Sequence, residues 1–271
     1  MSRILVLGGT GFIGTPVAQA LRAGRADVLT LGRSTSADVP LDVLEPGALE
    51  SFLRRERFDV VVNLAGAGLA AESVGLTTMT AVNADLPGRA LGVLLDSPRP
   101  PAFVHAASST ERLTDDEPDE SEYSRTKHAG AQAVRGLAGG ASTPVVVVRI
   151  HNTYGADQPR TRFVSWVVHE LGAGRPVHLH HPGRERDFVH LDDVVEGLVA
   201  VSRAPATMPR EVELGTGIGT TLSTVALSIA ALLGRPAALV GAAASPGADP
   251  HPRAVAAAPG GTLGVCRTTL P

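Results

Sequence analysis

A tyrosine and a lysine stand four positions apart in the segment Tyr123-Ser-Arg-Thr-Lys127. In a helix, residues with this spacing lie on one face. A phenol ordinarily loses its proton near pH 10, so tyrosine alone is a poor acid–base catalyst at neutral pH. A neighbouring ammonium group favours the phenolate and lowers that pKa. The pair therefore predicts a proton donor to a carbonyl under reduction, or a base in the reverse direction. The alternative is an exposed helix that carries the two residues by chance, although the chain has only two tyrosines.

A glycine-rich loop, Gly8-Gly-Thr-Gly11-Phe12-Ile13-Gly14, follows the apolar run Ile4–Leu7 directly. In dinucleotide-binding folds the first glycine makes a tight turn, the second lets a pyrophosphate approach the backbone, and the third packs helix on strand. The N-terminus of the helix then offers free N–H groups to the anion. A plain structural turn is the alternative, but the position between a buried strand and a helix favours dinucleotide binding. An oxidised nicotinamide beside Tyr123 would lower its pKa further.

Arg33 and Ser34 come just after the next apolar run, Val28–Leu31. NAD-binding folds usually place an acidic residue here, whereas arginine accommodates the extra phosphate of NADP. We therefore expect NADP(H), with NAD(H) as a possible cofactor; an arginine on the solvated surface is the alternative reading. Asp42 is either an adenine contact or a turn residue, and Asn83 either a cofactor contact or the partner of buried backbone groups. The predicted cofactor-binding residues are Gly8, Gly11, Phe12, Ile13, Gly14, Arg33, Asp42, Val43, Leu64, Ala65, Asn83 and Lys127.

The elements that must position these residues alternate between apolar runs and helical patterns. Such alternation indicates βαβ units around a parallel sheet, an α/β fold of the Rossmann type with a doubly wound sheet. The expected strands are Ile4–Leu7, Val28–Leu31, Val60–Leu64, Ala102–His105 and Val145–Ile150. The expected helices are Phe12–Ala23, one starting near Pro46, Leu76–Leu95 and Glu122–Leu137.

The pattern loosens after residue 150, which suggests a division of the chain. Residues 1–150 are expected to form the dinucleotide-binding domain, and residues 151–271 a smaller substrate-binding part interleaved with it. In this second part we expect helices at Phe163–Ala173, Asp193–Val201 and Leu222–Leu233, and strands at Val177–Leu179 and Glu211–Leu214. The stretch Gly241–Gly261 is rich in alanine, proline and glycine and is expected to be irregular.

Composition excludes several classes of protein. The 271 residues carry a formal net charge of -3 and a single cysteine, Cys266, so neither a disulfide framework nor a cysteine-built zinc site is expected. No basic block indicates nucleic-acid binding. No apolar run approaches the roughly 18 residues that would span a membrane, and the start does not resemble a signal peptide. The expectation is a cytoplasmic globular protein without a nucleic-acid or membrane partner.

Two further clusters have simpler explanations than a binding site. The run from Asp115 to Glu122 holds six carboxylates in eight positions, which suits a solvated loop before a helix N-terminus. His178, His180 and His181 lack a convergent set of carboxylate ligands, so we expect no metal site.

The glycine loop together with Tyr123 and Lys127 resembles the short-chain dehydrogenase/reductase superfamily. More narrowly, the chain resembles the extended branch, the NAD-dependent epimerase/dehydratase family of nucleotide-sugar enzymes. Segments that carry this narrower resemblance are Arg149-Ile-His-Asn152-Thr-Tyr-Gly155, Arg186-Asp187-Phe188-Val-His190-Leu-Asp-Asp193, Leu214-Gly-Thr-Gly217 and Leu263-Gly264. The resemblance covers nearly the whole chain.

The resemblance implies roles for individual residues. Ser108 would polarise the substrate carbonyl, with Ser109 and Thr110 as close alternatives. Lys127 would hold the nicotinamide ribose, and Asn152 and Arg186 would anchor the diphosphate of a nucleotide sugar. His190 and Asp193 would hold the loop behind Arg186. Family members commonly form homodimers through the helix with the Tyr–Lys pair and its neighbour, here Leu76–Leu95.

Departures from the family pattern narrow the expected activity. The Val-Tyr-Gly element after the serine is missing, and the short connection from Ser108 to Tyr123 resembles 4-ketoreductases of keto-deoxysugar nucleotides in antibiotic pathways. The Asp-Glu pair of the 4,6-dehydratases is absent. The distal arginine of the epimerases is absent too, so Arg186 has less help unless Arg162 or Arg253 substitutes. The prediction is an NADPH-dependent nucleotide-sugar ketoreductase. The alternatives are an NAD-dependent nucleotide-sugar epimerase and a non-catalytic dinucleotide sensor.

Overall fold

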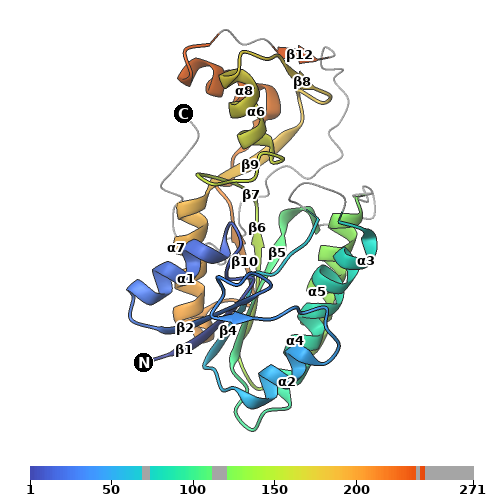
Figure 1. Ribbon diagram of the computed structural model, residues 1–271, viewed down its shortest axis with the longest axis vertical. Helices are drawn as coiled ribbons and strands as arrows, with labels where there is room; N and C mark the ends of the chain where they lie inside the picture. The colour runs from blue at the N-terminus through green and yellow to red at the C-terminus, as the bar shows by residue number, and fades with distance from the viewer. Residues whose placement is uncertain (69–73, 112–120, 236–238, 242–271) are drawn as a thin grey trace.

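The computed structural model describes residues 1–68, 74–111, 121–235 and 239–241. Positions 115–120 of the acidic run, Arg253, Cys266, Leu263-Gly264 and the tail after Gly241 lie outside them. A seven-stranded sheet fills the larger part of the molecule, at the bottom of Figure 1. In spatial order its strands are β10 (Glu211–Leu214), β6 (Val145–Ile150), β5 (Ala102–Ser108), β4 (Val60–Asn63), β1 (Arg3–Leu7), β2 (Asp27–Gly32) and β3 (Val39–Pro40).

Every neighbouring pair in this sheet is parallel. The chain starts in the middle, at β1, moves outward to β2 and β3, and then returns to build β4, β5 and β6 on the other side. This reversal of order defines a doubly wound sheet and leaves a crevice at the carboxyl ends of the strands. The predicted α/β fold of Rossmann type is confirmed.

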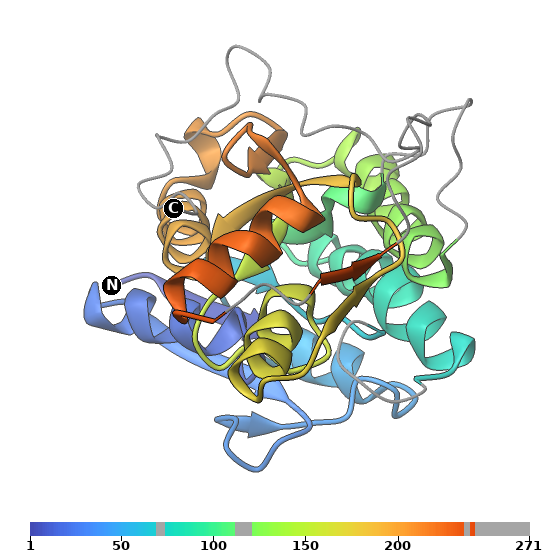
Figure 2. The same cartoon turned by 90° about the horizontal axis from the view of Figure 1, so that it is seen from above.

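Helices cover both faces of the sheet, and each face has its own apolar core. One core joins the sheet to α1 (Gly14–Ala23) and α7 (Leu191–Arg203). The other joins it to α2 (Ala48–Arg55), α4 (Leu86–Leu95) and α5 (Glu122–Ala138). Figure 2 shows these two helical layers on opposite sides. The central strands are buried on both faces, so their apolar residues run continuously rather than alternating.

The long helix predicted over Leu76–Leu95 is interrupted. It consists of α3 (Leu76–Met79), a π-helical turn η1 (Thr80–Asp85) and α4. Pro87 has no N–H to donate to the carbonyl of Asn83, four residues earlier. Gly130 of α5 lies against that same carbonyl, where any side chain would collide with it. The interruption therefore lets α5 approach closely, and α5 is the helix that carries the Tyr–Lys pair.

A smaller part lies over the carboxyl edge of the large sheet, at the top of Figure 1 and nearest the viewer in Figure 2. Its own core joins α6 (Phe163–Gly172), α8 (Leu222–Leu232) and nearby strands. The strands of this part are β7 (Asn152–Tyr154), β9 (Glu185–His190) and β11 (Gly219–Thr221) in one sheet, and β8 (Val177–Leu179) and β12 (Leu239–Gly241) in another. Two 3-10 turns, η2 (Ser109–Glu111) and η3 (Pro205–Thr207), complete the described elements.

The chain crosses between the two parts more than once. After β9 it returns to the large sheet, where α7 packs on α1 and β10 pairs with β6. Several short strands, among them β7, β9 and β11, were not predicted, because three to six residues in mixed polar segments give no clear period. Two of these strands hold the predicted substrate residues Asn152 and Arg186 at the junction of the two parts.

Candidate active site

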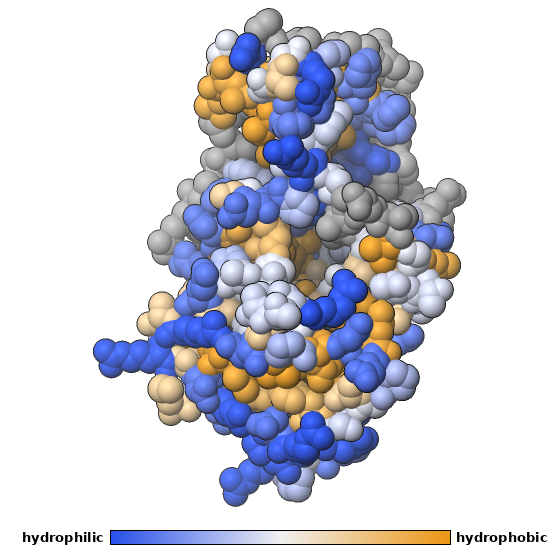
Figure 3. Space-filling model, viewed as in Figure 1, coloured by the Kyte–Doolittle hydropathy of each residue, from blue (hydrophilic) through white to orange (hydrophobic). Residues whose placement is uncertain are grey.

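A cavity of about 1570 Å³ opens along the carboxyl edge of the large sheet, beneath the smaller part. Figure 3 shows hydrophobic and weakly polar residues where the smaller part meets the larger one, with hydrophilic residues around them. The lining comes from the loops after β1, β2, β4, β5 and β6 and from the segment that enters β9. Predicted site residues in the lining are Gly8, Gly11, Phe12, Ile13, Gly14, Arg33, Asp42, Val43, Leu64, Ala65, Ser108, Tyr123, Lys127, Asn152 and Arg186.

The glycine loop has the geometry that dinucleotide-binding turns require. Gly8 adopts a φ of 74°, and a Cβ there would lie 2.8 Å from the backbone of Ala65. Gly14, the first residue of α1, lies so close to Gly8 that a side chain would collide with the Gly8 carbonyl. Gly11 faces open space apart from that carbonyl, 3.3 Å from its would-be Cβ. Backbone at Gly11 is therefore open to a ligand, while Gly8 and Gly14 hold the loop against the helix.

The end of β2 and the loop after it form the far wall of the cavity. Arg33 and Ser34 are exposed there. Asp42 is the one carboxylate among the described lining residues, and its Oδ1 accepts a hydrogen bond from the backbone N–H of Leu44 at 2.9 Å. Asp42 thus acts as the turn residue that the sequence left open, and it still faces the cavity.

Asn83 does not line the cavity. Its side chain is fully buried in η1, where Oδ1 accepts from the N–H of Ala67 and Nδ2 donates to the carbonyl of Ala67, both at 2.9 Å. Nδ2 also donates to the hydroxyl of Thr126 in α5 at 3.1 Å. The sequence left two roles open for Asn83, and these bonds are those of the second role, in which the amide pairs with buried backbone groups. It holds the loop after β4, which does line the cavity, while direct contact with the cofactor stays a prediction.

Tyr123 and Lys127 face the cavity from the first two turns of α5. The helix begins where the hydroxyl of Ser121 caps the N–H of Ser124 at 3.1 Å, so the tyrosine lies in the first turn. The buried ammonium of Lys127 donates to the carbonyl of Ala106 in β5 at 2.7 Å. Ser108 ends β5, and of the three candidate hydroxyls it is the one that contributes to lowering the pKa of Tyr123. Its Oγ also lies 2.9 Å from the hydroxyl of Thr110.

The electrostatics of the pair differ from the expectation. Burial raises the pKa of Tyr123 to about 12, and this outweighs the lowering by Arg162 and by the hydrogen bond with Ser108; Glu111 raises it further. Burial lowers the pKa of Lys127 to about 8, against the opposing effect of Glu111. The sequence predicted a tyrosine pKa below 10 because of the ammonium. In the structure desolvation is the larger effect, so the phenol keeps its proton at neutral pH.

Three further arginines line the cavity from the smaller part. They are Arg186 of β9, Arg162 before α6 and Arg184 before β9. Asn152 of β7 lines the cavity too, and contact of Asn152 and Arg186 with a diphosphate stays a prediction. Arg184 was missed from the sequence, although it stands two residues before Arg186. Cations in this number suit an anionic substrate group such as a diphosphate.

Asp187, next to Arg186, holds the loop that returns from β10. Its Oδ1 accepts from the N–H and hydroxyl of Thr216, at 2.9 and 2.6 Å, and its Oδ2 accepts from the N–H of Gly217 at 2.9 Å. His190, at the end of β9, caps α7 by accepting from the N–H of Asp192 at 3.2 Å. These contacts hold the strand that carries Arg186 at two places, beside the arginine and at the end of the strand.

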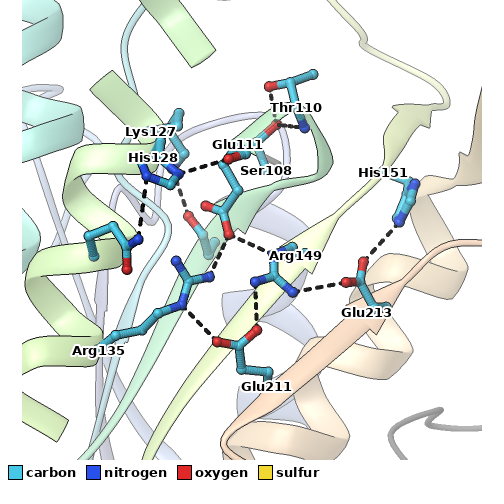
Figure 4. A network of polar contacts seen from close by, with 12 residues as sticks. Ser108, Thr110, Glu111, Lys127, His128, Arg135, Arg149, His151, Glu211 and Glu213 are labelled. Carbon is cyan, nitrogen blue, oxygen red and sulfur yellow. Dashed lines mark hydrogen bonds and ion pairs between the residues drawn. The ribbon is translucent and has the colours of Figure 1, made fainter. Parts of the chain in front are cut away.

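A partly buried charged network lies behind Ser108 and Lys127 (Figure 4). Glu111, in the turn after Ser108, accepts from Arg135 of α5 and from Arg149 of β6, both at 2.7 Å. Arg149 continues to Glu211 and Glu213 of β10, at 2.5 and 3.0 Å. Glu213 then pairs with His151 at 3.0 Å. The network thus ties the turn after Ser108 to α5 and to the strand that precedes Asn152.

We expect Glu111→Gln to lower the free energy of unfolding by about 2 kcal/mol. The carboxylate is 1% exposed, and both of its arginine partners would lose a charged acceptor. Breaking an isolated buried pair costs about 3–5 kcal/mol, but here both arginines keep other carboxylates. Urea denaturation measures the difference. Glu211→Gln is the matched control: this carboxylate is 41% exposed, so the loss should stay below about 1 kcal/mol. Equal losses for the two variants would contradict the expectation.

Comparison with known proteins places this site in a family. The model described as the NAD dependent epimerase/dehydratase family matches residues 4–215. The chain belongs to this family. The resemblance to the extended short-chain dehydrogenases/reductases is confirmed, and the chain is an NAD(P)-dependent enzyme of the oxidoreductase type.

Two named proteins are similar to this chain over most of their length. The dTDP-6-deoxy-L-talose 4-dehydrogenase (NAD(P)(+)) of Kitasatospora kifunensis is 31% identical over 246 residues, which cover 81% of this chain and 76% of that protein. The dTDP-L-rhamnose 4-epimerase of Burkholderia thailandensis is 25% identical over 300 residues, and this match covers 86% of this chain and 82% of that protein.

Solved structures of similar fold include MoeE5 in complex with UDP-glucuronic acid and NAD, with a TM-score of 0.75 at 23% identity, covering 89% of this chain and 86% of that one. UDP-glucose 4-epimerase of Thermus thermophilus in complex with NAD has a TM-score of 0.73 at 23% identity, covering 91% and 88%. At such identities the likeness concerns the fold.

The residues present fit a dinucleotide cofactor of this family. The close approach of Gly8 and Gly14, the open backbone at Gly11 and the N-terminus of α1 form a cradle for a pyrophosphate. Among the described residues, no helix is long and apolar enough to cross a membrane. Within the same ranges, no three histidine, cysteine, aspartate or glutamate side chains converge on a point that would hold a metal ion.

Proposed function

We propose that the chain uses NADPH to reduce the keto group of a nucleotide-linked deoxysugar, as a dTDP-4-keto-6-deoxyhexose 4-ketoreductase. The observation that carries this proposal is the 31% identity, over 81% of the chain, to a relative named as a dTDP-6-deoxy-L-talose 4-dehydrogenase. Reversal of the reaction in that name is the reduction of a 4-keto group on a dTDP-6-deoxyhexose.

The side chains that line the cavity suit the reduction of a keto group. The cofactor supplies hydride to the carbonyl carbon when it is bound. Ser108 donates a hydrogen bond to the carbonyl oxygen as negative charge develops there. Tyr123 then gives its proton to the alkoxide, and its raised pKa means that the proton is present at neutral pH. Lys127, held by the carbonyl of Ala106, orients the nicotinamide ribose, and Asn152 and Arg186 anchor the diphosphate.

Arg33 supports NADPH over NADH in this proposal. Its guanidinium lies at the end of β2 beside Ser34, where an extra ribose phosphate would accept paired hydrogen bonds. The only lining carboxylate in the described ranges, Asp42, lies on the next loop and bonds its own turn. The proposal also keeps the cytoplasmic location, the homodimer and the division into residues 1–150 and 151–271 that the sequence suggests.

An NAD-dependent nucleotide-sugar epimerase is the second candidate. The relative named as a dTDP-L-rhamnose 4-epimerase favours it, because it matches 86% of the chain. The same Ser–Tyr–Lys chemistry serves both reactions, since an epimerase oxidises and reduces one carbon in turn. A cofactor-binding sensor without turnover is the alternative from another class of protein.

One assay separates these functions. The purified protein is mixed with a dTDP-4-keto-6-deoxyhexose and either NADPH or NADH, and nicotinamide absorbance and sugar product are followed. We expect stoichiometric oxidation of the cofactor with formation of a 4-hydroxy sugar, and a higher kcat/KM with NADPH. Inversion at C4 of a non-keto sugar nucleotide without net oxidation would establish the epimerase instead. Cofactor binding with no turnover of any sugar nucleotide would establish the sensor.

A further inference from the structure

The hydroxyl of Ser108 is bound by a second hydroxyl two residues further along the chain. Thr110, in the 3-10 turn η2, has its Oγ1 2.9 Å from the Oγ of Ser108 (Figure 4). The backbone N–H of Thr110 donates to the same Ser108 Oγ at 3.3 Å. Both side chains line the cavity. The sequence offered Thr110 only as a replacement for Ser108, whereas these two bonds make it the partner of that hydroxyl.

The turn that carries Thr110 is fixed through its last residue, Glu111. The carboxylate of Glu111 accepts from Arg135 and Arg149, both at 2.7 Å. The backbone carbonyl of Glu111 accepts from the Nδ1 of His128 in α5 at 2.8 Å. Helix α5 and strand β6 therefore hold Thr110 in place on the wall of the cavity, which a hydroxyl with a positioning role requires.

Donors and acceptors at Ser108 decide which of the two hydroxyls donates. A hydroxyl has one proton and two lone pairs. The bond of Ser108 lowers the pKa of Tyr123, as a proton directed at the phenol oxygen does. If Ser108 instead gave its proton to Thr110, it would present only lone pairs to a carbonyl oxygen in the cavity, and these repel. The proton of Ser108 therefore belongs to the cavity, and its lone pairs are left for Thr110.

We infer that Thr110 is a positioning residue whose hydroxyl and backbone N–H both donate to Ser108, so that the only proton of Ser108 is directed at the substrate carbonyl oxygen. This inference rests on the role of Ser108 in the proposed function. Hydrogen bonds in a chain polarise one another, so a serine that accepts two bonds is also the stronger donor. Thr110 thereby helps to stabilise the negative charge that develops on the substrate oxygen without contacting that oxygen.

A double-mutant cycle tests whether Thr110 acts through Ser108. The variants are Thr110→Val, which removes the hydroxyl at nearly constant volume, Ser108→Ala, and the two combined. We expect Ser108→Ala to lower kcat about a hundredfold. Thr110→Val alone should lower kcat about tenfold, with the KM of the sugar nucleotide and the Kd of NADPH unchanged. In the Ser108→Ala background, Thr110→Val should change kcat by less than about twofold, whereas a merely structural role would lower it in both backgrounds.

Two further variants separate the hydroxyl from the shape of the side chain. Thr110→Ser keeps the hydroxyl and should recover kcat to within about threefold of the wild-type value. Thr207→Val is the matched control, because it makes the same change in the other 3-10 turn, η3. The hydroxyl of Thr207 donates to the carbonyl of Ala204 at 2.9 Å, and its side chain is exposed and outside the cavity lining, so kcat should stay unchanged. If Thr110→Val does not fold, as judged by near-UV circular dichroism, Thr110→Ala provides the same comparison.

Three kinetic results would overturn the inference. The first is an equal loss of kcat for Thr110→Val with and without the hydroxyl of Ser108. The second is a wild-type kcat in Thr110→Val. The third is a greater loss for Thr110→Val than for Ser108→Ala, because Thr110 would then itself polarise the carbonyl.

Neutron diffraction from crystals exchanged into heavy water shows the same arrangement without turnover. We expect the deuteron of the Thr110 hydroxyl on the line to the Oγ of Ser108, and the deuteron of Ser108 directed into the cavity. A Ser108 deuteron on the line to Thr110 would overturn the inference. Because this measurement needs no sugar, the expected deuterons in a protein that turns over no sugar nucleotide would contradict the proposed function and leave the arrangement of the two hydroxyls standing.

Discussion

Replacement of Tyr123 by phenylalanine is expected to lower kcat about a thousandfold while the dissociation constant of NADPH stays unchanged. The change removes only the phenolic O–H, and with it the proton for the alkoxide. The ring remains to fill its place at the start of α5, so the cap at Ser121 and the contact of Lys127 with β5 should persist. Turnover is measured with saturating NADPH and keto sugar, and NADPH binding by quenching of protein fluorescence.

Tyr154→Phe is the matched control, because it makes the same chemical change at the other tyrosine. Tyr154 packs edge-on against His190, with the ring centres 5.2 Å apart, and does not line the cavity. This variant should keep most of the turnover. If Tyr123→Phe retained more than about a tenth of kcat, a different group would be the proton donor, because general acid catalysis normally contributes at least about a hundredfold.

The pH dependence of the reduction separates the two members of the pair. Because burial holds the pKa of Tyr123 near 12, the phenol stays protonated across the neutral range and does not limit the rate there. Burial brings the pKa of Lys127 down to about 8, so its ammonium loses its proton first as the pH rises. A decline of reduction on the alkaline side would accordingly report on Lys127 before Tyr123.

The residues that the sequence predicted best are those whose chemistry depends on local spacing. Gly8 and Gly14 lie within one stretch of seven residues, and Tyr123 and Lys127 lie about one helical turn apart. Such relations follow from backbone geometry alone, so a single sequence contains them. The doubly wound parallel sheet was predicted from a similarly local pattern, apolar runs separated by helical patterns.

Glu111 and Arg162 illustrate what the sequence could not supply. Glu111 is separated from Arg149 by 38 positions, and their pairing depends on β5 and β6 lying side by side. Arg162 and Tyr123 line one cavity only because the smaller part lies over the edge of the large sheet. Desolvation has the same origin, because the burial that raises the pKa of Tyr123 comes from the folded cavity. The four-residue spacing to Lys127 contains no information about that burial.

Gly14→Ala is expected to reduce both stability and cofactor binding. The new methyl group would collide with the carbonyl of Gly8, which belongs to the same rigid turn, so either α1 or the loop must move. Overpacking against backbone of this kind costs about 3 kcal/mol of unfolding free energy. Since the displaced groups form the pyrophosphate cradle, the affinity for NADPH should fall by more than about tenfold. Urea denaturation and fluorescence titration measure the two effects.

Two other glycine substitutions separate the effect on stability from the effect on cofactor binding. Gly92→Ala in α4 adds a methyl group into open space, and alanine is the better helix former by up to about 1 kcal/mol, so stability should hold or rise. Gly11→Ala has its nearest neighbour at 3.3 Å, so the fold should tolerate it, but the methyl group would occupy the approach to the backbone that a pyrophosphate needs. Gly11→Ala should therefore weaken NADPH binding with little loss of stability. If Gly11→Ala bound NADPH normally while Gly14→Ala did not, the loop would hold the helix without contacting the cofactor, and the cradle would have to be sought elsewhere along the edge of the sheet.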